Sequence, residues 1–401
     1  MSQDHGPKLK FSVAVSRNND AAKAGIEISE AVRRGLDREP ADLAFLFFSP
    51  HYVETAEDLA AAVRAELDPR VLLGCTGEGV IAESEEIEGD PAVALWAARL
   101  PGASVSPIRL SFTQQQEEGF TVSGWPDLPA EGSEAPTFLL LAEPFSTPVD
   151  EVLSSMADRY PGSLAIGGLA GGGHDFGQNR VLLNDEVHDS GLVGVAVSGP
   201  VSVRTLVSQG CRPIGERFVV TRAEKNVIHE LGGSPALARL ETVFKSLGSA
   251  ERRMAHRALH VGIVMDEQRN RFERGDFLIR NLVGADRTTG SVAIGDLVRE
   301  GQTVQFHIRD AGSASEDLNL LLTAERSKDA RPTRGALLFS CCGRGRGLFG
   351  RPHHDVMTVR ERMGDIPIAG FFAQGEIGPV GGSNFLHGYT ASVALFSEPG
   401  S

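Results

Sequence analysis

Cysteine is scarce in this sequence and long apolar runs are missing, and each absence excludes a class of protein. The 401 residues contain four cysteines without CxxC spacing, which indicates neither a disulfide framework nor an oxidising compartment. No apolar run approaches the roughly 20 residues of a membrane-spanning helix, and the first residues show no charged-then-apolar signal peptide. We therefore expect a cytoplasmic, intracellular protein without membrane association.

Positive charge is also in short supply. Lysine and arginine number 39 against 53 acidic residues, which gives a net charge of -14. A nucleic-acid-binding surface needs clustered cations, so no nucleic-acid partner is expected. The sequence signatures of P-loop nucleotide hydrolases, α/β-hydrolases and zinc proteases do not occur either. With 41% hydrophobic residues, the chain can still bury a large core.

Three segments of the chain repeat one pattern: an apolar strand, an amphipathic helix, a second apolar strand that ends in glycine, a glycine-rich turn and a third strand. The three copies comprise residues 43–97, 138–198 and 336–396. This repetition predicts a mixed α/β fold in which two packed β-sheets, flanked by helices, are built from duplicated strand-helix-strand units. Such units are also common in unrelated α/β folds, so the alternative that the copies are not homologous stays open.

The segment between the second and third copies has a different pattern. Residues 201–208 and 218–221 alternate in polarity like strands, and a Gly-Gly-Ser-Pro run at 232–235 breaks the chain before a predicted helix. Short strands with turns follow over 259–308, which indicates an antiparallel meander. We therefore divide the chain into an N-terminal extension and first strand (1–35), an N-terminal domain (36–233) and a C-terminal domain (234–397).

The most informative stretch of the chain lies in the third copy, within residues 369–382, and contains five glycines. Glycine removes side chains where a ligand approaches the backbone closely, and Gln374, Glu376, Asn384 and His387 supply polar groups around the gap. These features predict a glycine-lined cleft that binds a small molecule.

A second candidate site is the run Cys341-Cys342-Gly343-Arg344-Gly345-Arg346, which follows an apolar strand. Its backbone N–H groups and two guanidinium groups predict a nest for a carboxylate or phosphate. Alternatively, the run is a flexible turn whose arginines pair with surface acids.

Two glutamates, Glu78 and Glu376, occupy matching places just after a glycine in the first and third copies. If the copies are related by approximate symmetry, both carboxylates flank one cleft and bind an ammonium group, while Arg344 or Arg346 meets the carboxylate of the same amino acid. The alternative is that each glutamate accepts backbone hydrogen bonds within its own turn. The predicted ligand-binding residues are Gly74, Cys75, Glu78, Cys341, Arg344, Arg346, Gln374, Gly375, Glu376, Asn384 and His387.

Several segments, in this order, resemble the FIST family: residues 74–81, 184–187, 210–215, 275–281, 341–346 and 369–390. The resemblance begins near residue 42 and implies a FIST N-terminal domain followed by a FIST C-terminal domain. It also implies a sensory, signal-transducing role in which a small anionic or zwitterionic ligand, with amino acids among the candidates, is bound and reported to a separate signalling protein. Eukaryotic members carry an F-box, which this chain lacks, so a ubiquitin-ligase role is not expected.

Two alternatives to a ligand sensor remain. Cys341 is a candidate nucleophile with His353 or His354 as base and Glu376 as orienting group, although a cysteine at a strand end is more often a small buried apolar residue. The other alternative is a protein-interaction scaffold without a ligand.

No metal or cofactor is expected. The histidines in His353-His354-Asp355 are adjacent and diverge, and the pair His256 and His260 has no Cys or carboxylate cluster to complete a metal site. The glycine run at 167–173 does not match the dinucleotide-binding spacing.

Overall fold

The computed structural model describes residues 8–114, 119–128, 135–256, 258–269, 272 and 275–400. The chain forms two compact units: residues 1–207 with 319–401 make unit 1, and residues 208–318 make unit 2. The predicted mixed α/β class is confirmed, but the described residues form four sheets rather than two, three in unit 1 and one in unit 2. The chain passes between the two units after residue 207 and again after residue 318. Neither position is the domain boundary predicted after residue 233, which stays a prediction.

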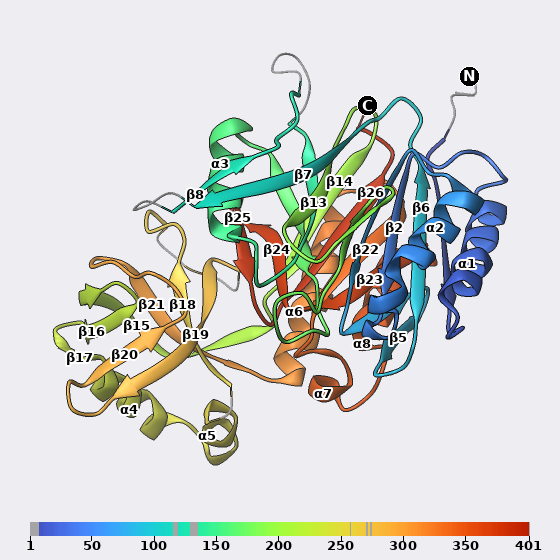
Figure 1. Ribbon diagram of the computed structural model, residues 1–401. Coiled ribbons are helices and arrows are strands. Elements are labelled where there is room, and N and C mark those ends of the chain that lie inside the picture. Colours follow the sequence, from blue (N-terminus) through green and yellow to red (C-terminus); the bar gives the residue numbers. More distant parts are fainter. Residues whose placement is uncertain are drawn as a thin grey trace. The chain divides into compact units, whose positions relative to one another are not determined.

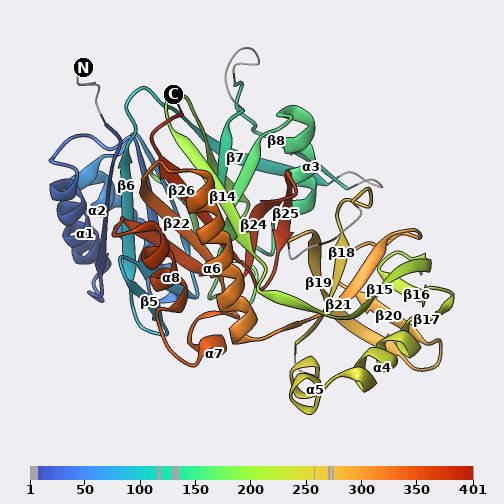
Figure 2. The same ribbon diagram turned by 180° about the vertical axis from the view of Figure 1, so that it is seen from behind.

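Each sheet of unit 1 is centred on two parallel strands from one of the predicted copies (Figures 1 and 2). An antiparallel strand that closes the copy lies beside the first strand of each pair. The three sets are β2 (Leu43–Phe48), β3 (Val71–Thr76) and β6 (Val93–Arg99); β9 (Thr137–Ala142), β10 (Leu164–Leu169) and β13 (Leu192–Ser198); and β22 (Thr333–Cys341), β23 (Ile368–Ala373) and β26 (Ala391–Ser397). The internal repetition predicted from the sequence is therefore confirmed.

The three copies exchange hairpins in a cycle. After its second parallel strand, each copy leaves its own sheet and adds a hairpin to the sheet of another copy. The hairpin β4 (Gly79–Ala82)–β5 (Glu85–Glu88) pairs with β23, β11 (Val181–Leu183)–β12 (Glu186–His188) pairs with β3, and β24 (Gly375–Val380)–β25 (Ser383–His387) pairs with β10. The three sheets are consequently related by an approximate threefold repeat.

A leucine–glycine pair marks the same register position in every copy. The pairs are Leu46 with Gly74, Leu140 with Gly167, and Leu338 with Gly370. A Cβ atom on these glycines would lie 2.5, 1.8 and 1.7 Å, respectively, from the carbonyl oxygen of the paired leucine. Only glycine fits where the two backbones approach so closely.

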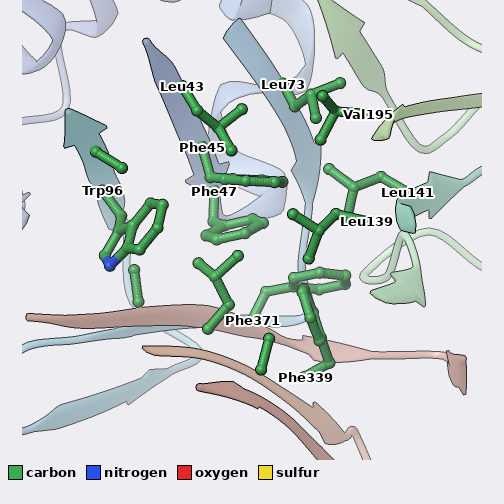
Figure 3. Close-up of a cluster of buried hydrophobic side chains, with 14 of the residues drawn as sticks. Leu43, Phe45, Phe47, Leu73, Trp96, Leu139, Leu141, Val195, Phe339 and Phe371 are labelled. Carbon is green, nitrogen blue, oxygen red and sulfur yellow. The ribbon is translucent and has the colours of Figure 1, made fainter. Parts of the chain in front are cut away.

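The core of unit 1 lies between the sheets. Figure 3 shows aromatic and aliphatic side chains from β2, β9, β22 and β23 gathered in this core, among them Phe47 and Phe371, whose ring centroids are 5.2 Å apart. Trp96 of β6 is fully buried at its edge and donates from Nε1 to the carbonyl oxygen of Pro367 at 3.2 Å. The central strands are covered on both faces, by another sheet on one side and by helices on the other. Their sequences are therefore apolar at nearly every position instead of at alternate positions.

Helices cover the outer faces of the sheets. The helices α1 (Ala21–Gly35) and α2 (Ala56–Leu67) pack side by side on the first sheet and bury Ile28, Val32 and Leu59 against it. On the second sheet lies α3 (Val149–Arg159), and α8 (His354–Met363) lies against β5 and β22. Unit 1 also contains β1 (Lys10–Ser16), η1 (Pro50–Thr55), β7 (Ser104–Gln114), β8 (Phe120–Ser123), β14 (Ser202–Ser208) and α7 (Gly345–Phe349).

Unit 2 is a closed antiparallel ring of strands. Its order is β15 (Cys211–Glu224), β21 (Thr303–Arg309), β18 (Leu259–Val264), β19 (Phe277–Asp286), β20 (Ser291–Ile294) and β16 (Val227–Leu231), and β16 pairs back onto β15. The predicted antiparallel meander is confirmed for β18 to β20, whereas β21 returns beside β18. The short strand β17 (Ser234–Pro235) leads into α4 (Ala236–Ser246), which is followed by α5 (Ser249–Ala255).

The long helix α6 (Ala311–Lys328) contributes residues to both units. Among the described helices, none is long and apolar enough to cross a membrane.

Candidate functional site

The three glycine turns meet at one point of unit 1, which we call the vertex and define as residues 76–78, 169–171 and 372–374. Three backbone hydrogen bonds close it in a cycle: Glu78 N to Phe372 O (3.0 Å), Gln374 N to Leu169 O (3.1 Å), and Gly171 N to Thr76 O (3.0 Å). A Cβ on Gly171 would lie 2.9 Å from Phe372 O and 3.1 Å from Glu78 N. The carboxyl ends of parallel strands, where α/β proteins commonly bind small molecules, thus converge from all three copies.

The hydrogen-bond cycle corrects the proposed match between the two glutamates. Glu78 is equivalent to Gln374, because both donate from the backbone to the last residues of another copy's strand. The strand register instead places Glu376 at the position of Val80 and Val181. The hypothesis that Glu78 and Glu376 occupy matching places is therefore wrong by two residues, although both lie close to the vertex.

Glu376 is a fully buried acid in a core position of β24. Its Oε2 accepts from the backbone N (3.0 Å) and the hydroxyl (2.8 Å) of Thr390, and its Oε1 has no hydrogen-bond partner among the described residues. Burial and the nearby Cys341 raise the pKa of Glu376 well above its ordinary value. Because the equivalent positions of the other copies hold valine, this buried carboxyl group is a costly exception to the repeat and is a candidate site residue.

Two cysteines lie beside Glu376. Cys341 ends β22, is buried, and accepts a hydrogen bond at Sγ from the backbone N of Tyr389 at 3.2 Å. Cys342 is exposed, and a hydrogen bond with the Cys341 thiol lowers the pKa of Cys342. The exposed carboxylate of Glu78 also lies near Cys342. The structure therefore brings together one exposed thiol, one exposed acid and one buried acid.

Gln374 is the third polar group at the vertex. Its Nε2 donates to the carbonyl oxygen of Gly173 at 3.3 Å, which fixes the orientation of the amide. Its Oε1 is buried and has no hydrogen-bond donor among the residues that the structure describes. Gln374 and Glu376, two residues apart in the chain, thus each have a buried acceptor atom without a donor among the described residues, which is uncommon inside proteins.

Comparison with known proteins finds two family models that match successive parts of the chain. The family model described as the FIST N domain matches residues 42–234, and the model described as the FIST C domain matches residues 236–379. The chain belongs to the FIST family. FIST domains are regarded as sensory and signal-transduction domains, and this coarse assignment applies to the present chain.

Relatives of this FIST protein occur in mycobacteria. An uncharacterized protein of Mycobacterium tuberculosis is 42% identical over 390 residues, which cover 97% of this chain and 100% of the relative. An uncharacterized protein of Mycobacterium bovis is 40% identical over 392 residues, which cover 97% of this chain and 99% of the relative.

The FIST chain uses Arg344 for an internal ion pair. Arg344 is 1% exposed, and its Nε and Nη2 donate to Asp355 Oδ2 (2.6 Å) and Oδ1 (2.9 Å). Ser340 also donates to this carboxylate at 2.7 Å. Burial alone would raise the pKa of Asp355, but the charge and hydrogen bonds of Arg344 outweigh it and hold the pKa below its ordinary value. The predicted open nest for an anion is thus a closed bidentate pair, and only Arg346 is exposed.

Glu86 links two copies of the repeat and was not anticipated from the sequence. Its Oε1 accepts from the backbone N of Asp355 (2.8 Å) and Val356 (2.9 Å) in the first turn of α8, and its own N donates to His353 Nδ1 (2.8 Å). Burial and the charge of Asp355 raise the pKa of Glu86 to about 7. These hydrogen bonds connect the β4–β5 hairpin of the first copy to the N-terminus of α8 in the third copy.

This raised pKa predicts a pH dependence of stability. A carboxyl group with a raised pKa stabilises the folded state fully below its unfolded pKa, and this contribution is lost as pH rises through about 7. We expect the free energy of unfolding of the wild type, relative to Glu86→Gln, to fall by about 3 kcal/mol between pH 4.5 and 7.5. Urea titrations across this range test it, with Glu85→Gln, a half-exposed acid of the same strand, as the control. A constant difference between wild type and Glu86→Gln would contradict the prediction.

The other predicted ligand-binding residues have structural contacts. Gly74 and Cys75 lie in the buried strand β3, and burial raises the pKa of Cys75 well above its ordinary value. Asn384 bridges the backbones of Ala165 and Ser163, accepting at 2.8 Å and donating at 3.0 Å. His387 is buried opposite Glu376 in the β24–β25 hairpin, with Nε2 3.0 Å from the carbonyl oxygen of Gly378, and Gly375 begins β24.

The histidines proposed as bases or metal ligands are also engaged. His353 accepts from Glu86, as described above, and His354 lies 2.9 Å from Asp355 and stacks on Phe349. His260 lies on β18, and burial lowers its pKa to about 4. No group of three or more His, Cys, Asp or Glu side chains that could hold a metal occurs in the described part of the chain.

Proposed function

We propose that this protein is a sensor whose vertex binds a small ligand through an ammonium group, so that the zwitterionic class, amino acids included, fits better than an anion. The observation that carries the proposal is Glu376, a buried acid with an unpartnered oxygen at a position where the other two copies hold valine. Gln374 contributes a second acceptor without a donor. An ammonium group supplies three donors for these acceptors, and its positive charge favours the ionised form of Glu376 against the burial that raises the pKa of this residue.

Charge balance favours a cationic group. Arg344 could attract an anion, but its charge is balanced by Asp355 at hydrogen-bonding distance. The exposed Glu78 disfavours a carboxylate and favours an ammonium group at the entrance. The proposal therefore keeps the predicted role of the glutamates, which is to bind the ammonium group of an amino acid. It no longer assigns Arg344 to the carboxylate of that amino acid.

The location of Glu376 indicates how binding becomes a signal. Glu78 and Cys342 are exposed whereas Glu376 is fully buried, so a ligand reaches Glu376 only if the surrounding backbone moves; we propose that the segment that moves is the turn at Gly388–Thr390, whose Thr390 donates to Glu376. Tyr389 in this turn has a φ of 67°, a strained conformation for a residue with a side chain. Binding that shifts this turn alters the surface presented to a separate signalling protein, which is the partner that we propose.

The variant Glu376→Val, which restores the residue of the other copies, tests the proposal. We expect it to abolish ligand binding and to change the free energy of unfolding by less than about 2 kcal/mol, because removing the buried acid is offset by the loss of its hydrogen bonds from the backbone N and hydroxyl of Thr390. Thermal shift of wild type against amino acids, primary amines and dicarboxylates should show stabilisation only by compounds with an ammonium group.

Glu85→Gln, which changes a half-exposed acid of β5 that pairs with Arg17, serves as the control; it should leave binding unchanged and alter the free energy of unfolding by less than about 1 kcal/mol. Stabilisation by dicarboxylates, or undiminished binding by Glu376→Val, would refute the proposal. Binding lost equally in Glu85→Gln would show that the effect is not specific to Glu376.

The cysteine-enzyme alternative predicts that Cys341 reacts first, whereas the structure predicts that Cys342 does. Cys342 is exposed and has a lowered pKa, while Cys75, Cys211 and Cys341 are buried. We expect iodoacetamide to modify Cys342 at least about tenfold faster than the other three in the folded protein, as measured by peptide mass spectrometry. Cys342→Ser should remove the fast phase. Faster modification of Cys341 would revive the alternative in which it is a nucleophile.

A further inference from the structure

Unit 2 contains a groove that is separate from the vertex. It has a volume of about 530 Å³ and is bounded by α4, α5 and the turn between β19 and β20. Leu237, Leu240 and Phe244 of α4 form its apolar floor. Its size is that of a site for a small organic molecule, and an apolar floor is typical of such sites.

Hydrogen bonds connect the elements that line the groove and order the turn between β19 and β20. The backbone N of Leu237 at the start of α4 donates to Gly290 O at 2.9 Å, which joins the helix to the β19–β20 turn. Asp286 orders that turn by accepting from the backbone N of Thr288 (2.7 Å) and the hydroxyl of Thr289 (2.9 Å). From α5, Arg252 Nη2 donates to the carbonyl oxygen of Lys245 at 2.7 Å. These bonds make the groove preformed, so little ordering is needed on binding.

The rim of the groove is positively charged. Lys245, Arg252 and Arg287 line it together with a single acid, Glu241. None of the three cations pairs with a carboxylate in the described part of the chain. This local excess of positive charge occurs in a chain whose net charge is -14. A groove with an apolar floor and a cationic rim matches a molecule with an apolar body and one anionic head.

We propose that this groove binds a soluble amphiphilic anion, of which a medium-chain fatty carboxylate is the simplest. The alkyl chain lies along Leu237, Leu240 and Phe244, and the carboxylate meets Arg252 and Arg287 at the rim. The site does not depend on the function proposed for the vertex, since all its residues belong to unit 2.

Calorimetric titration of the full-length chain tests this proposal. Octanoate, decanoate and dodecanoate, each below its micelle concentration, should bind with affinity that rises about fourfold per added methylene until the groove is filled. Decyltrimethylammonium, which carries a similar chain with the opposite charge, should bind at least about tenfold more weakly than decanoate.

Charge-reversal variants locate the site. The single variant Arg287→Glu changes the β19–β20 turn without removing the Arg252–Lys245 hydrogen bond, and should weaken decanoate at least about fivefold. The double variant Arg252→Glu/Arg287→Glu should prefer decyltrimethylammonium to decanoate. Arg253→Glu is the matched control, because Arg253 is exposed on the same helix α5 but does not line the groove.

Several results would overturn the proposal. One is equal affinity for decanoate and decyltrimethylammonium. Another is equal weakening of decanoate binding by Arg253→Glu and Arg287→Glu. A third is binding that occurs only with vesicles of anionic lipid and not with free decanoate. The last result would identify the cationic rim as a membrane contact instead.

Discussion

Replacing Asp355 with Asn should lower the free energy of unfolding of unit 1 by about 3–5 kcal/mol. Both members of the Arg344–Asp355 pair are nearly inaccessible to solvent, with side-chain exposures of 0% and 1%. The neutral amide leaves the positive charge of Arg344 buried without its counter-charge, and desolvating an uncompensated ion is far costlier than losing a hydrogen bond. The effect is local to unit 1, where Ser340, α7 and α8 also depend on this carboxylate.

Tryptophan fluorescence in urea measures this effect selectively. The chain has two tryptophans, and both Trp96 and Trp125 belong to unit 1. The control is the exposed ion pair between Arg17 and Glu85, where Arg17→Ala should cost less than about 1 kcal/mol. A cost below about 1 kcal/mol for Asp355→Asn would show that water reaches Arg344 and that the pair is not buried in solution.

A double replacement separates the buried charge from the packing. Arg344→Met with Asp355→Leu removes both charges and keeps side chains of similar length in the site. Because a buried ion pair often contributes little beyond an apolar pair of similar volume, this protein should unfold within about 2 kcal/mol of the wild type. If the double variant were as unstable as Asp355→Asn, most of the destabilisation would come from the hydrogen bonds that Ser340 and His354 lose.

Gly370→Ala should be the most damaging single methyl group that can be added to unit 1. A Cβ at this position would lie 1.7 Å from the carbonyl oxygen of Leu338 and 2.7 Å from its carbonyl carbon. Both atoms are backbone of the neighbouring parallel strand, so no side-chain rotation relieves the overlap and the strands must separate. We expect a loss above about 4 kcal/mol in the free energy of unfolding, or no soluble protein.

Two further glycine variants make this prediction quantitative. Gly74→Ala, at the equivalent position of the first copy, places its Cβ 2.5 Å from the carbonyl oxygen of Leu46 and should cost less than Gly370→Ala. Gly347→Ala is the control, since nothing lies within 4 Å of its Cβ, and should change the free energy of unfolding by less than about 1 kcal/mol. The ranking, measured by urea titration and soluble yield, is the test. A stable Gly370→Ala protein would refute the close strand approach.

The repeat was predictable because its signals are local. An apolar strand, a helix and a strand ending near glycine can each be recognised within a few residues, and the three strand pairs are confirmed. The number of sheets was not predictable, because a short apolar strand such as β4 has the same pattern whether it pairs with its own copy or with β23. The cyclic exchange of hairpins is decided by contacts between residues far apart in the chain.

In the candidate site, too, features with a local sequence signal were predictable, and contacts between separate segments were not. Gln374 and Glu376 were predicted from polar residues beside glycine, and the structure places both at or next to the vertex. The sequence did not show that Arg344 pairs with Asp355, because the pairing requires α7 to return the chain to the end of β22. Glu86 lies 269 residues from Asp355 along the chain, so no local pattern connects the two.

By itself, the sequence determined the mixed α/β class, the three copies, the glycine turns and the family, because apolar periodicity and backbone requirements are properties of short segments. Tertiary structure alone decided which copy completes which sheet, and which polar groups are buried. It also decided that Glu376 occupies a position filled by valine in the other copies. The physical reason is that burial and ionisation depend on what packs around a side chain, and at the vertex the packing comes from all three copies.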